Sequence, residues 1–418
     1  MLQPMNKSVK NARVLVTVRG EDTPGITASL TGIVALTSAR LLDVEQVVVH
    51  GQLTLCLLLE LNGEGPTSVL KDLLFAAKGL NMELDFKLLD APGSDELYEE
   101  LKRYAITAIG AKIGAQVIHD VTTLLAKHKA NIDKIHRLSN GDLRSVEIEI
   151  SFWPQDSTEQ NPEAEYERNV VERLRRELVA YASPEHIDIA VQKNNLLRRQ
   201  KRLVVMDMDS TLIKVEIIDE LARIHGVYDE VAKVTEQAMQ GDMEFDDSLR
   251  MRVKLLKGLP FSKAKELADD LPVSEGAEQL LQVLKRLGFK TAVLSGGFTF
   301  AAEALKSRLG LDYAYANDLE VQNGVFTGNV VGPIVGPQRK ADLLDVIAQQ
   351  EGILLEQTIA VGDGANDMLM LERAGLGIAF HAKAKLKAAA DTTLSGGGLH
   401  NILYFLGLTE RDIQAFSR

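Results

Sequence analysis

Residues 203–211 read LVVMDMDST, and this stretch decides the fold predicted for the second half of the chain. Its four apolar residues predict a short buried strand, and two aspartates, Asp207 and Asp209, follow that strand directly. Such carboxylates can both point into a crevice beyond the strand end, where ligands bind. An EF-hand calcium loop would need glycine at its sixth position and glutamate at its twelfth, where this chain has Leu212 and Ile218. We therefore expect an open α/β sheet with a ligand site at this strand end.

Two further apolar strands also end in polar clusters. Residues 291–294 precede the run SGG at 295–297, and residues 358–361 precede the run GDGAND at 362–367. Ligands in open α/β sheets lie outside the carboxyl ends of the strands, so the three clusters are expected to meet in one site. Each cluster alone is also compatible with an ordinary turn or a helix N-cap. Their order and placement together favour a composite site.

A phosphate monoester as substrate would explain these groups together. Asp207 can act as a nucleophile and form an aspartyl-phosphate, which splits one difficult displacement into two. Asp209 is placed to protonate the leaving alkoxide and then to activate water. Mg²⁺ suits an all-oxygen site, and Asp207 and Asp363 are its expected side-chain ligands. Ser295 and nearby backbone amides can hold the phosphoryl oxygens, while Lys340 is the candidate that completes the charge balance.

The order Asp-x-Asp-x-Thr, Ser, Lys and Gly-Asp-Gly-x-x-Asp over residues 202–405 resembles the haloacid dehalogenase superfamily of phosphatases. The resemblance implies a Rossmann-like core with a small helical cap, for which residues 215–271 are rich in helix formers. It also implies that the backbone carbonyl of Asp209 is a metal ligand. By the same resemblance, Asp367 orients the cluster from outside the ligand sphere.

Within that superfamily, this segment most closely resembles the phosphoserine phosphatases, which implies hydrolysis of O-phosphoserine in the last step of serine biosynthesis. The substrate-binding positions implied by the match are Glu216, Met239, Phe245, Arg252, Ser295, Gly296, Gly297, Lys340 and Asn366. Arg252 can clamp the substrate carboxylate with its guanidinium, and Glu216 can pair with the ammonium. Met239 and Phe245 would exclude water as the cap closes. From the residues alone, Arg252 is equally compatible with a solvated helix face.

The first half of the chain contains an internal repeat. A βαββαβ order is predicted for residues 11–91 and again for residues 103–192. Three pairs of residues share one offset: Gly20 and Gly110 (110 − 20 = 90), Asp43 and Asp133 (133 − 43 = 90), and Gly51 and Gly141 (141 − 51 = 90). Gly51 and Gly141 are expected to supply backbone freedom in hairpins. Matching element order favours duplication over chance agreement of turn glycines.

Each repeat resembles the ACT domain, a ferredoxin-like module that binds a free amino acid in many enzymes of amino-acid metabolism. The resemblance implies a ligand beside the loop between the first strand and the first helix. The effector-binding candidates are therefore Gly20, Asp22, Gly25, Gly110 and Gly114. The loop GAKIG at 110–114 lacks the acidic residue and the proline of GEDTPG at 20–25, which leaves open whether both repeats bind. L-Serine as effector and a homodimer are the partners this suggests.

Composition narrows the class of protein. A chain of 418 residues suggests roughly two to four domains, and the polar segment 193–202 predicts a linker or short helix before the phosphatase body. A net charge of −12 argues against nucleic acid and anionic membranes as partners. The single cysteine, Cys56, excludes an intrachain disulfide and fits a reducing compartment.

We find no signal-like or bilayer-spanning segment, so a cytoplasmic location is expected. Two alternatives remain open at this point: a phosphatase for another small phosphomonoester, and an amino-acid sensor with a vestigial phosphatase domain.

Overall fold

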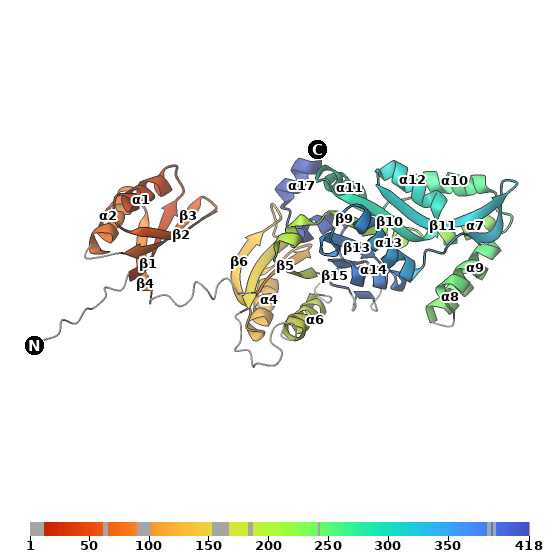
Figure 1. Cartoon of the computed structure of the whole chain (residues 1–418), viewed down its shortest axis with the longest axis horizontal. Coiled ribbons are helices and arrows are strands. Elements are labelled where there is room, and N and C mark those ends of the chain that lie inside the picture. The colour runs from red at the N-terminus through yellow and green to blue at the C-terminus, as the bar shows by residue number, and fades with distance from the viewer. Residues whose placement is uncertain are drawn as a thin grey trace, which may run out of the picture. The chain divides into compact units, whose positions relative to one another are not determined.

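The structure is a computed structural model that describes residues 12–61, 66–89, 102–152, 167–182, 187–240, 243–382, 386–387 and 390–417. Within these ranges, the side chains at 66–67, 167–168 and 239–240 are not described. The chain divides into two compact units, residues 1–100 and 101–418 (Figure 1). No described helix is both long and apolar enough to cross a membrane.

The first unit is a four-stranded antiparallel sheet with two helices. Its elements are β1 (Ala12–Glu21), α1 (Ile26–Ala35), β2 (Arg40–Val49), β3 (Gln52–Leu61), α2 (Pro66–Gly79) and β4 (Glu83–Leu89). The strand order is β2-β3-β1-β4. Every second residue of β1 and β3 is buried, as expected for strands with one face against a core. The predicted βαββαβ order is confirmed here.

The second repeat has the same element order and sheet topology. It comprises β5 (Lys102–Gly110), α4 (Ala115–Lys127), β6 (Asn131–Arg137), β7 (Ser145–Phe152), α6 (Glu172–Ala182) and β8 (Ile187–Lys193). The strand order is β6-β7-β5-β8. Gly51 and Gly141 both have positive φ, 76° and 61°, which explains why glycine occupies the equivalent hairpin position in each repeat. Unlike β1 and β3, strands β7 and β8 are buried along nearly their whole length.

Strands β5, β7 and β8 of the second repeat are buried along most of their length, and this repeat packs against the C-terminal part of the chain. Asp188 on β8 accepts hydrogen bonds from the backbone N–H groups of Ser395 at 2.7 Å and Gly396 at 3.2 Å. Gln192 donates to the carbonyl of Phe405 at 2.9 Å. The segment predicted as a linker or short helix forms a 3₁₀ turn at Leu196–Gln200. Residues 101–418 are therefore one compact unit.

The phosphatase body is built on a seven-stranded sheet of order β12-β11-β10-β9-β13-β14-β15. Its strands are β9 (Leu203–Met206), β10 (Lys290–Phe298), β11 (Tyr313–Gln322), β12 (Val325–Val331), β13 (Thr358–Gly362), β14 (Gly377–Phe380) and β15 (Thr392–Leu394). Only the β11–β12 pair is antiparallel. Strand β9 lies between β10 and β13, so the three polar strand ends meet at one edge of the sheet, as predicted.

The central position of β9 in the sheet explains why its sequence is continuously apolar. Val204 and Met206 belong to the core on one face of the sheet, and Leu203 and Val205 belong to the core on the other. A parallel strand covered on both faces needs apolar side chains at every position. The covering helices are α11 (Ala277–Arg286), α12 (Thr299–Leu309), α13 (Pro337–Gln350), α14 (Met368–Arg373), α16 (Ile402–Phe405) and α17 (Glu410–Ser417).

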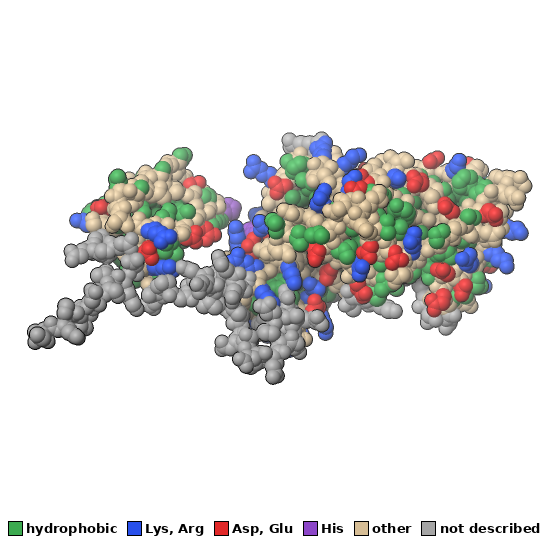
Figure 2. All heavy atoms as spheres, in the orientation of Figure 1, with side chains coloured by type: hydrophobic (Ala, Val, Ile, Leu, Met, Phe, Trp, Pro, Cys, Tyr) green, Lys and Arg blue, Asp and Glu red, His purple; other side chains and the backbone are tan. Residues whose placement is uncertain are grey.

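Four of the helices that lie between β9 and β10 in the chain form the predicted cap. They are α7 (Ile217–His225), α8 (Tyr228–Gln240), α9 (Phe245–Leu255) and α10 (Phe261–Asp269). The cap lies at the end of this unit away from β5 and β6 (Figure 1). The chain enters and leaves the cap side by side, because Ile213 pairs with Val273 and Lys214 N–H donates to Pro272 at 2.9 Å. On the face of this unit drawn in Figure 2, acidic and basic side chains are interspersed rather than gathered by sign.

Candidate active site

Asp207 lies directly beyond β9 and is buried, with 4% of its surface exposed. Its backbone N–H donates to the carbonyl of Val361 on the neighbouring strand β13 at 2.9 Å. Its carboxylate Oδ1 accepts from the Met208 N–H at 2.7 Å and lies 2.7 Å from Nζ of Lys340. Backbone pairing of β9 and β13 therefore sets the position of Asp207, and the lysine contacts one of its two oxygens.

Lys340 is the fourth residue of α13 and is fully buried. Its Nζ lies 2.7 Å from Oδ1 of Asp207 and 2.7 Å from Oδ1 of Asp367. Burial opposes the charged form of the amine, but the two carboxylates outweigh that cost and raise the pKa of Lys340 above its usual range. Helix α13 thus places the positively charged amine of Lys340 between two buried aspartates.

Carboxylates outnumber cations at this strand edge. Oxygens of Asp207, Asp363 and Asp367 lie within 4.8 Å of one another. Burial, together with the charges of Asp367 and Asp209, raises the pKa of Asp207 well above its usual range. Burial also raises the pKa of Asp363 to about 7, and the charge of Asp367 adds to this. Since Lys340 offsets only part of this negative charge, the all-oxygen set fits a divalent cation.

Asp209 turns away from that group of oxygens. Its Oδ1 accepts from the N–H of Ile217, the first residue of α7, at 2.8 Å, and its Oδ2 accepts from the Ser295 hydroxyl at 3.1 Å. Burial raises the pKa of Asp209 to about 7, and the charge of Glu216 contributes in the same direction. Asp209 therefore has the protonation behaviour that a general acid and base requires near neutral pH.

The segment Ser295–Gly297 leaves the regular sheet. The pairing of β10 with β9 ends at Val293, and its pairing with β11 skips from Leu294 to Phe298. Ser295 is fully buried, and its hydroxyl accepts from the N–H of Gly297 at 2.8 Å. A Cβ atom at position 297 would lie only 2.5 Å from Oδ2 of Asp209, so this position requires glycine. The turn that looked ordinary in the sequence is shaped around Asp209.

Phe245, at the start of α9 in the cap, lies against two loops of the body. A Cβ atom on Gly296 would lie 2.9 Å from Cζ of this ring, and one on Gly336 would lie 3.2 Å from its Cδ1. The aromatic ring thus lies over Gly296 near the end of β10 and over Gly336 in the loop before α13. Met239 lies in α8, but its side chain is outside the described residues.

The predicted charged residues Glu216 and Arg252 both interact electrostatically with Asp209. Glu216 is exposed, and its Oε1 accepts from the Ser210 hydroxyl at 2.6 Å. Arg252 is half-buried on α9, whereas Arg250 and Lys254 beside it are exposed. Burial lowers the pKa of Arg252, and the negative charges of Glu216 and Asp209 oppose that effect. Arg252 is therefore in a different environment from the solvated residues that flank it.

Asp219 on α7 also belongs to this charged group, although no sequence motif indicated it. Burial raises its pKa, and Glu216 adds to the shift while Arg252 opposes it. Its position one helical turn after Glu216 is the signal in the sequence that would have pointed to it.

The run GDGAND forms a tight turn between β13 and α14. Asp367 is fully buried, and its Oδ2 accepts from the N–H of Gly364 at 3.1 Å. A Cβ atom on Gly362 would lie 2.4 Å from Cγ of Asp367, and one on Gly364 would lie 2.3 Å from Oδ1 of Asn366. Both glycines are thus required by side chains that fold back over the turn. Asn366 lies beside Asp363 in this turn and is half-buried.

The effector candidates lie in the two expected strand-to-helix loops. In the first unit, Gly20 faces Met82, whose Sδ would lie 2.4 Å from an added Cβ, and Gly25 has φ 99° before α1. Asp22 is exposed, and its N–H donates to Gly51 at 2.8 Å. In the second repeat, Gly110 ends β5 and Gly114 precedes α4. Packing against Met82 therefore explains glycine at position 20, and a positive φ explains glycine at position 25, whether or not a ligand binds there.

Comparisons with known proteins agree with this arrangement. A family profile described as haloacid dehalogenase-like hydrolase matches residues 201–375, and two ACT-domain profiles match residues 12–87 and 103–192. A phosphoserine phosphatase of Mycobacterium tuberculosis is 39% identical over 406 residues, which cover 96% of this chain and 95% of the relative. One of Streptomyces coelicolor is 39% identical over 404 residues, covering 96% and 94%. The chain belongs to the phosphoserine phosphatase family.

Solved structures related to this phosphoserine phosphatase family member agree with its fold. A HAD-family hydrolase of Salmonella enterica serovar Typhi superimposes with a TM-score of 0.60 at 29% identity, covering 72% of this chain and 98% of that one. A probable phosphoserine phosphatase of Vibrio cholerae gives a TM-score of 0.55 at 33% identity, covering 75% and 89%. Hydrolases of the HAD superfamily generally use a divalent metal ion. The two ACT domains are compatible with regulation by an amino acid.

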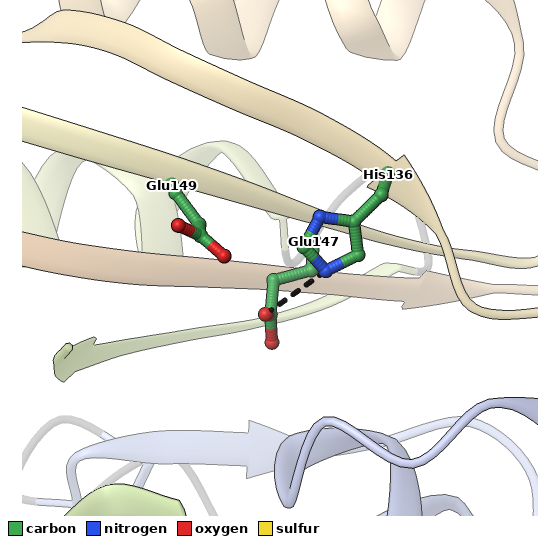
Figure 3. A group of neighbouring side chains, drawn as sticks. All are labelled: His136, Glu147 and Glu149. Carbon is green, nitrogen blue, oxygen red and sulfur yellow. Dashed lines mark ion pairs between the residues drawn. The ribbon is translucent and has the colours of Figure 1, made fainter. Parts of the chain in front are cut away.

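A second group of metal-ligand types lies in the second ACT domain of this family member, on β6 and β7 (Figure 3). Nε2 of His136 lies 3.2 Å from Oε1 of Glu147, and Glu149 lies two residues further along the same strand. Buried Arg198 pairs with Glu147, and Nη2 of Arg199 lies 3.5 Å from Glu149. An arginine faces each carboxylate, so this cluster links the 3₁₀ turn to the sheet.

Proposed function

We propose that this chain hydrolyses O-phospho-L-serine to L-serine and phosphate through an aspartyl-phosphate on Asp207. The observation that carries the proposal is the buried Asp207–Lys340 contact at the end of β9, with Asp209 held by Ser295 beside it. Phosphoserine phosphatase is also the printed name of relatives that match nearly the whole chain. A vestigial phosphatase domain is disfavoured, because every predicted catalytic side chain is present and brought to one edge of the sheet.

In the first step, a carboxylate oxygen of Asp207 attacks the phosphorus atom. The described residues donate two hydrogen bonds to this carboxylate, from Met208 and Lys340, and both reach Oδ1. The bond between phosphorus and the serine oxygen breaks, and protonated Asp209 gives its proton to the leaving alkoxide. The pKa of Asp209, raised to about 7, keeps that proton available near neutral pH.

In the second step, water attacks the phosphorus atom of the aspartyl-phosphate. Asp209 accepts a proton from the water as the bond between phosphorus and Asp207 breaks. Inorganic phosphate leaves, and both aspartates return to their starting protonation states. Ser295 positions Asp209 through its hydroxyl and, with the amide of Gly296, would hold the phosphoryl oxygens, whereas the Gly297 N–H donates to the Ser295 hydroxyl.

Mg²⁺ is the cation proposed for the cluster of carboxylates. Asp207 and Asp363 would hold it with their side chains and Asp209 with its backbone carbonyl, while Asp367 supports the group from its contact with Lys340. When bound, the ion supplies charge neutralisation for the phosphoryl oxygens. Thr211, whose hydroxyl donates to Asp363 at 3.2 Å, orients that ligand.

Substrate choice is assigned to the cap and the loop around Asn366. Arg252 pairs with the α-carboxylate of phosphoserine and Glu216 with its α-ammonium. Phe245 and Met239 exclude water above the phosphoryl group. A phosphatase for another small phosphomonoester would keep the catalytic groups but would have no use for this pair of opposite charges.

L-Serine is the effector that we propose for the ACT domains, with Gly20, Asp22 and Gly25 beside it in the first and Gly110 and Gly114 in the second. A cytoplasmic homodimer is the proposed working form. Serine titrated into the full chain should bind, and Asp22→Ala should weaken that binding, whereas Asp72→Ala on the exposed face of α2 should not. Unaltered serine affinity in Asp22→Ala would remove Asp22 from the effector site.

The proposed activity is tested by measuring phosphate release from O-phosphoserine, O-phosphothreonine, phosphoethanolamine and a sugar phosphate, each with and without Mg²⁺. We expect phosphoserine to be preferred in kcat/KM. Preference for the sugar phosphate would leave the catalytic mechanism in place and overturn the substrate.

A further inference from the structure

Asn317 on β11 is a buried polar residue outside every motif of the site. Only 1% of its surface is exposed. Its Nδ2 donates to the carbonyl of Gly296 at 2.8 Å, and its Oδ1 accepts from the N–H of Val335 at 2.8 Å. The NH₂ group and the oxygen of this side-chain amide therefore both bind backbone groups, and these partners belong to two different loops of the candidate active site.

The first loop, Ser295–Gly297, needs this bond because it has left the sheet. Its backbone lies outside the pairing of β10 with β9 and with β11, so the carbonyl of Gly296 has no strand partner from either ladder. Gly296 is half-buried, and a carbonyl shielded from water without a donor is costly, so Asn317 supplies that donor. By holding this carbonyl on the side of β11, Asn317 orients the peptide groups of the segment.

The second loop, Val335–Gly336, leads into α13. Gly336 is the residue before the first turn of that helix, and its carbonyl accepts from the N–H of Lys340 at 3.0 Å. Holding Val335 in place therefore sets the start of the helix that carries Lys340. The same two loops provide Gly296 and Gly336, the glycines that the ring of Phe245 covers.

We infer that Asn317 is a positioning residue for phosphoryl recognition, which sets the spacing between the Ser295–Gly297 loop and the start of α13. It acts through those loops and does not touch the substrate. Only asparagine among residues of this size offers both a donor for Gly296 and an acceptor for Val335. Aspartate would keep the acceptor and lose the donor, and two oxygens would then face each other.

This inference rests on the proposed phosphatase activity, so the wild-type enzyme is assayed first with O-phosphoserine and Mg²⁺. A wild-type enzyme without turnover would refute the proposed function rather than the role of Asn317. Two variants then test the role: Asn317→Asp removes the donor, and Asn317→Ala removes both hydrogen bonds without adding charge. Using both separates loss of the bond from electrostatic repulsion of phosphate. If the buried charge of the first variant prevents folding, the second carries the comparison alone.

Thr358 provides a matched control at the opposite end of β13. It is fully buried, and its hydroxyl donates to Leu355 at 2.7 Å and accepts from the N–H of Gly375 at 3.2 Å. Thr358→Val should lower the melting temperature without altering the site, because both partners lie at the edge of the sheet away from Asp207.

The decisive readouts are KM for phosphoserine and the inhibition constant of inorganic phosphate, each measured on folded protein. We expect both constants to rise about 10-fold or more in the two Asn317 variants, the size expected for losing a buried hydrogen bond that orients a charged ligand site. The Mg²⁺ concentration for half-maximal activity should stay near the wild-type value. Unchanged phosphate inhibition in both variants, or an equal rise in Thr358→Val, would show that Asn317 serves stability alone and overturn the inference.

Discussion

Nζ of Lys340 lies 2.7 Å from Oδ1 of Asp207, and both side chains are buried. The contact joins a helix start to a strand end, so a residue of α13 controls the charge of the residue that follows β9. Burial opposes the charged form of Lys340, but the charges of Asp207 and Asp367 outweigh it and raise the pKa of the lysine. Burial and the charges of Asp367 and Asp209 raise the pKa of Asp207, and Lys340 opposes that shift. Lys340 therefore favours the ionised form of Asp207 against the effects of burial and of the neighbouring aspartates.

Lys340→Met should abolish turnover and destabilise the protein. Removing the amine leaves Asp207 and Asp367 buried without their shared cation, a loss of about 3–5 kcal/mol for a broken buried ion pair. Urea denaturation measures the change, and the double variant Lys340→Met/Asp367→Asn should recover part of the stability but none of the activity. Lys306→Met, on the surface of α12, is the control. A Lys340→Met enzyme with wild-type stability would contradict the ionic role of this lysine.

Chelation of divalent metal should remove activity, and Mg²⁺ should restore it. In Asp363→Asn the Mg²⁺ concentration for half-maximal activity should rise by roughly 10-fold or more, since a ligand carboxylate becomes a neutral amide. Asp345→Asn, on the exposed face of α13 where it pairs with Arg373, should leave the Mg²⁺ dependence unchanged. Equal Mg²⁺ dependence in the two variants would remove Asp363 from the metal site.

Arg252→Ala should raise KM for phosphoserine by roughly 10- to 100-fold, because it removes the charged partner of the substrate carboxylate. Phosphoethanolamine has no carboxylate, so its KM should change little. Arg250→Ala, two residues earlier on the exposed side of α9, is the matched control. Steady-state kinetics on both substrates distinguish the two arginines, and a similar KM increase for both substrates would mean that Arg252 supports the cap rather than the carboxylate.

The fold of the site could be predicted because it depends on local patterns. The apolar strands 203–206, 291–294 and 358–361 each end in polar residues, and parallel strands bring such ends to one edge. Asn317 was not predictable in this way. Its role depends on a bulge in β10 that removes Gly296 from the ladder, which no periodicity in the sequence reveals. Met239 lies in the predicted cap, but its side chain is outside the described residues.

The packing of the second ACT domain on the phosphatase body was also not predictable from the sequence. The polar, basic segment 193–202 is typical of an exposed linker, yet Arg198 is buried against Glu147. Asp188 is committed to backbone groups of Ser395 and Gly396, more than two hundred positions away. A run of charged residues in the sequence indicates only that the segment is polar. Whether those side chains are buried depends on which backbone groups from distant parts of the chain lack a hydrogen-bond partner in the fold.

The Glu147–Arg198 pair predicts a pH dependence of stability. Burial alone would raise the pKa of Glu147, but hydrogen bonds from His136 and Arg198 lower it from 4.5 to about 2. Because the folded value lies below the unfolded one, this stabilisation is present above pH 4.5 and is lost as pH falls toward 2, amounting to at most about 3 kcal/mol. Thermal unfolding between pH 7 and about 3 should show a shallower loss in Glu147→Gln than in the wild type. Parallel curves would contradict this role.

The central claim, that Asp207 is the nucleophile, is tested most directly by rapid acid quenching of the enzyme during turnover of O-phosphoserine. Mass spectrometry of the peptide that contains residues 203–211 then locates any covalent phosphate. We expect an acid-stable, hydroxylamine-sensitive phosphoryl group on Asp207. Phosphate on another residue, or turnover that persists in Asp207→Asn, would contradict the account.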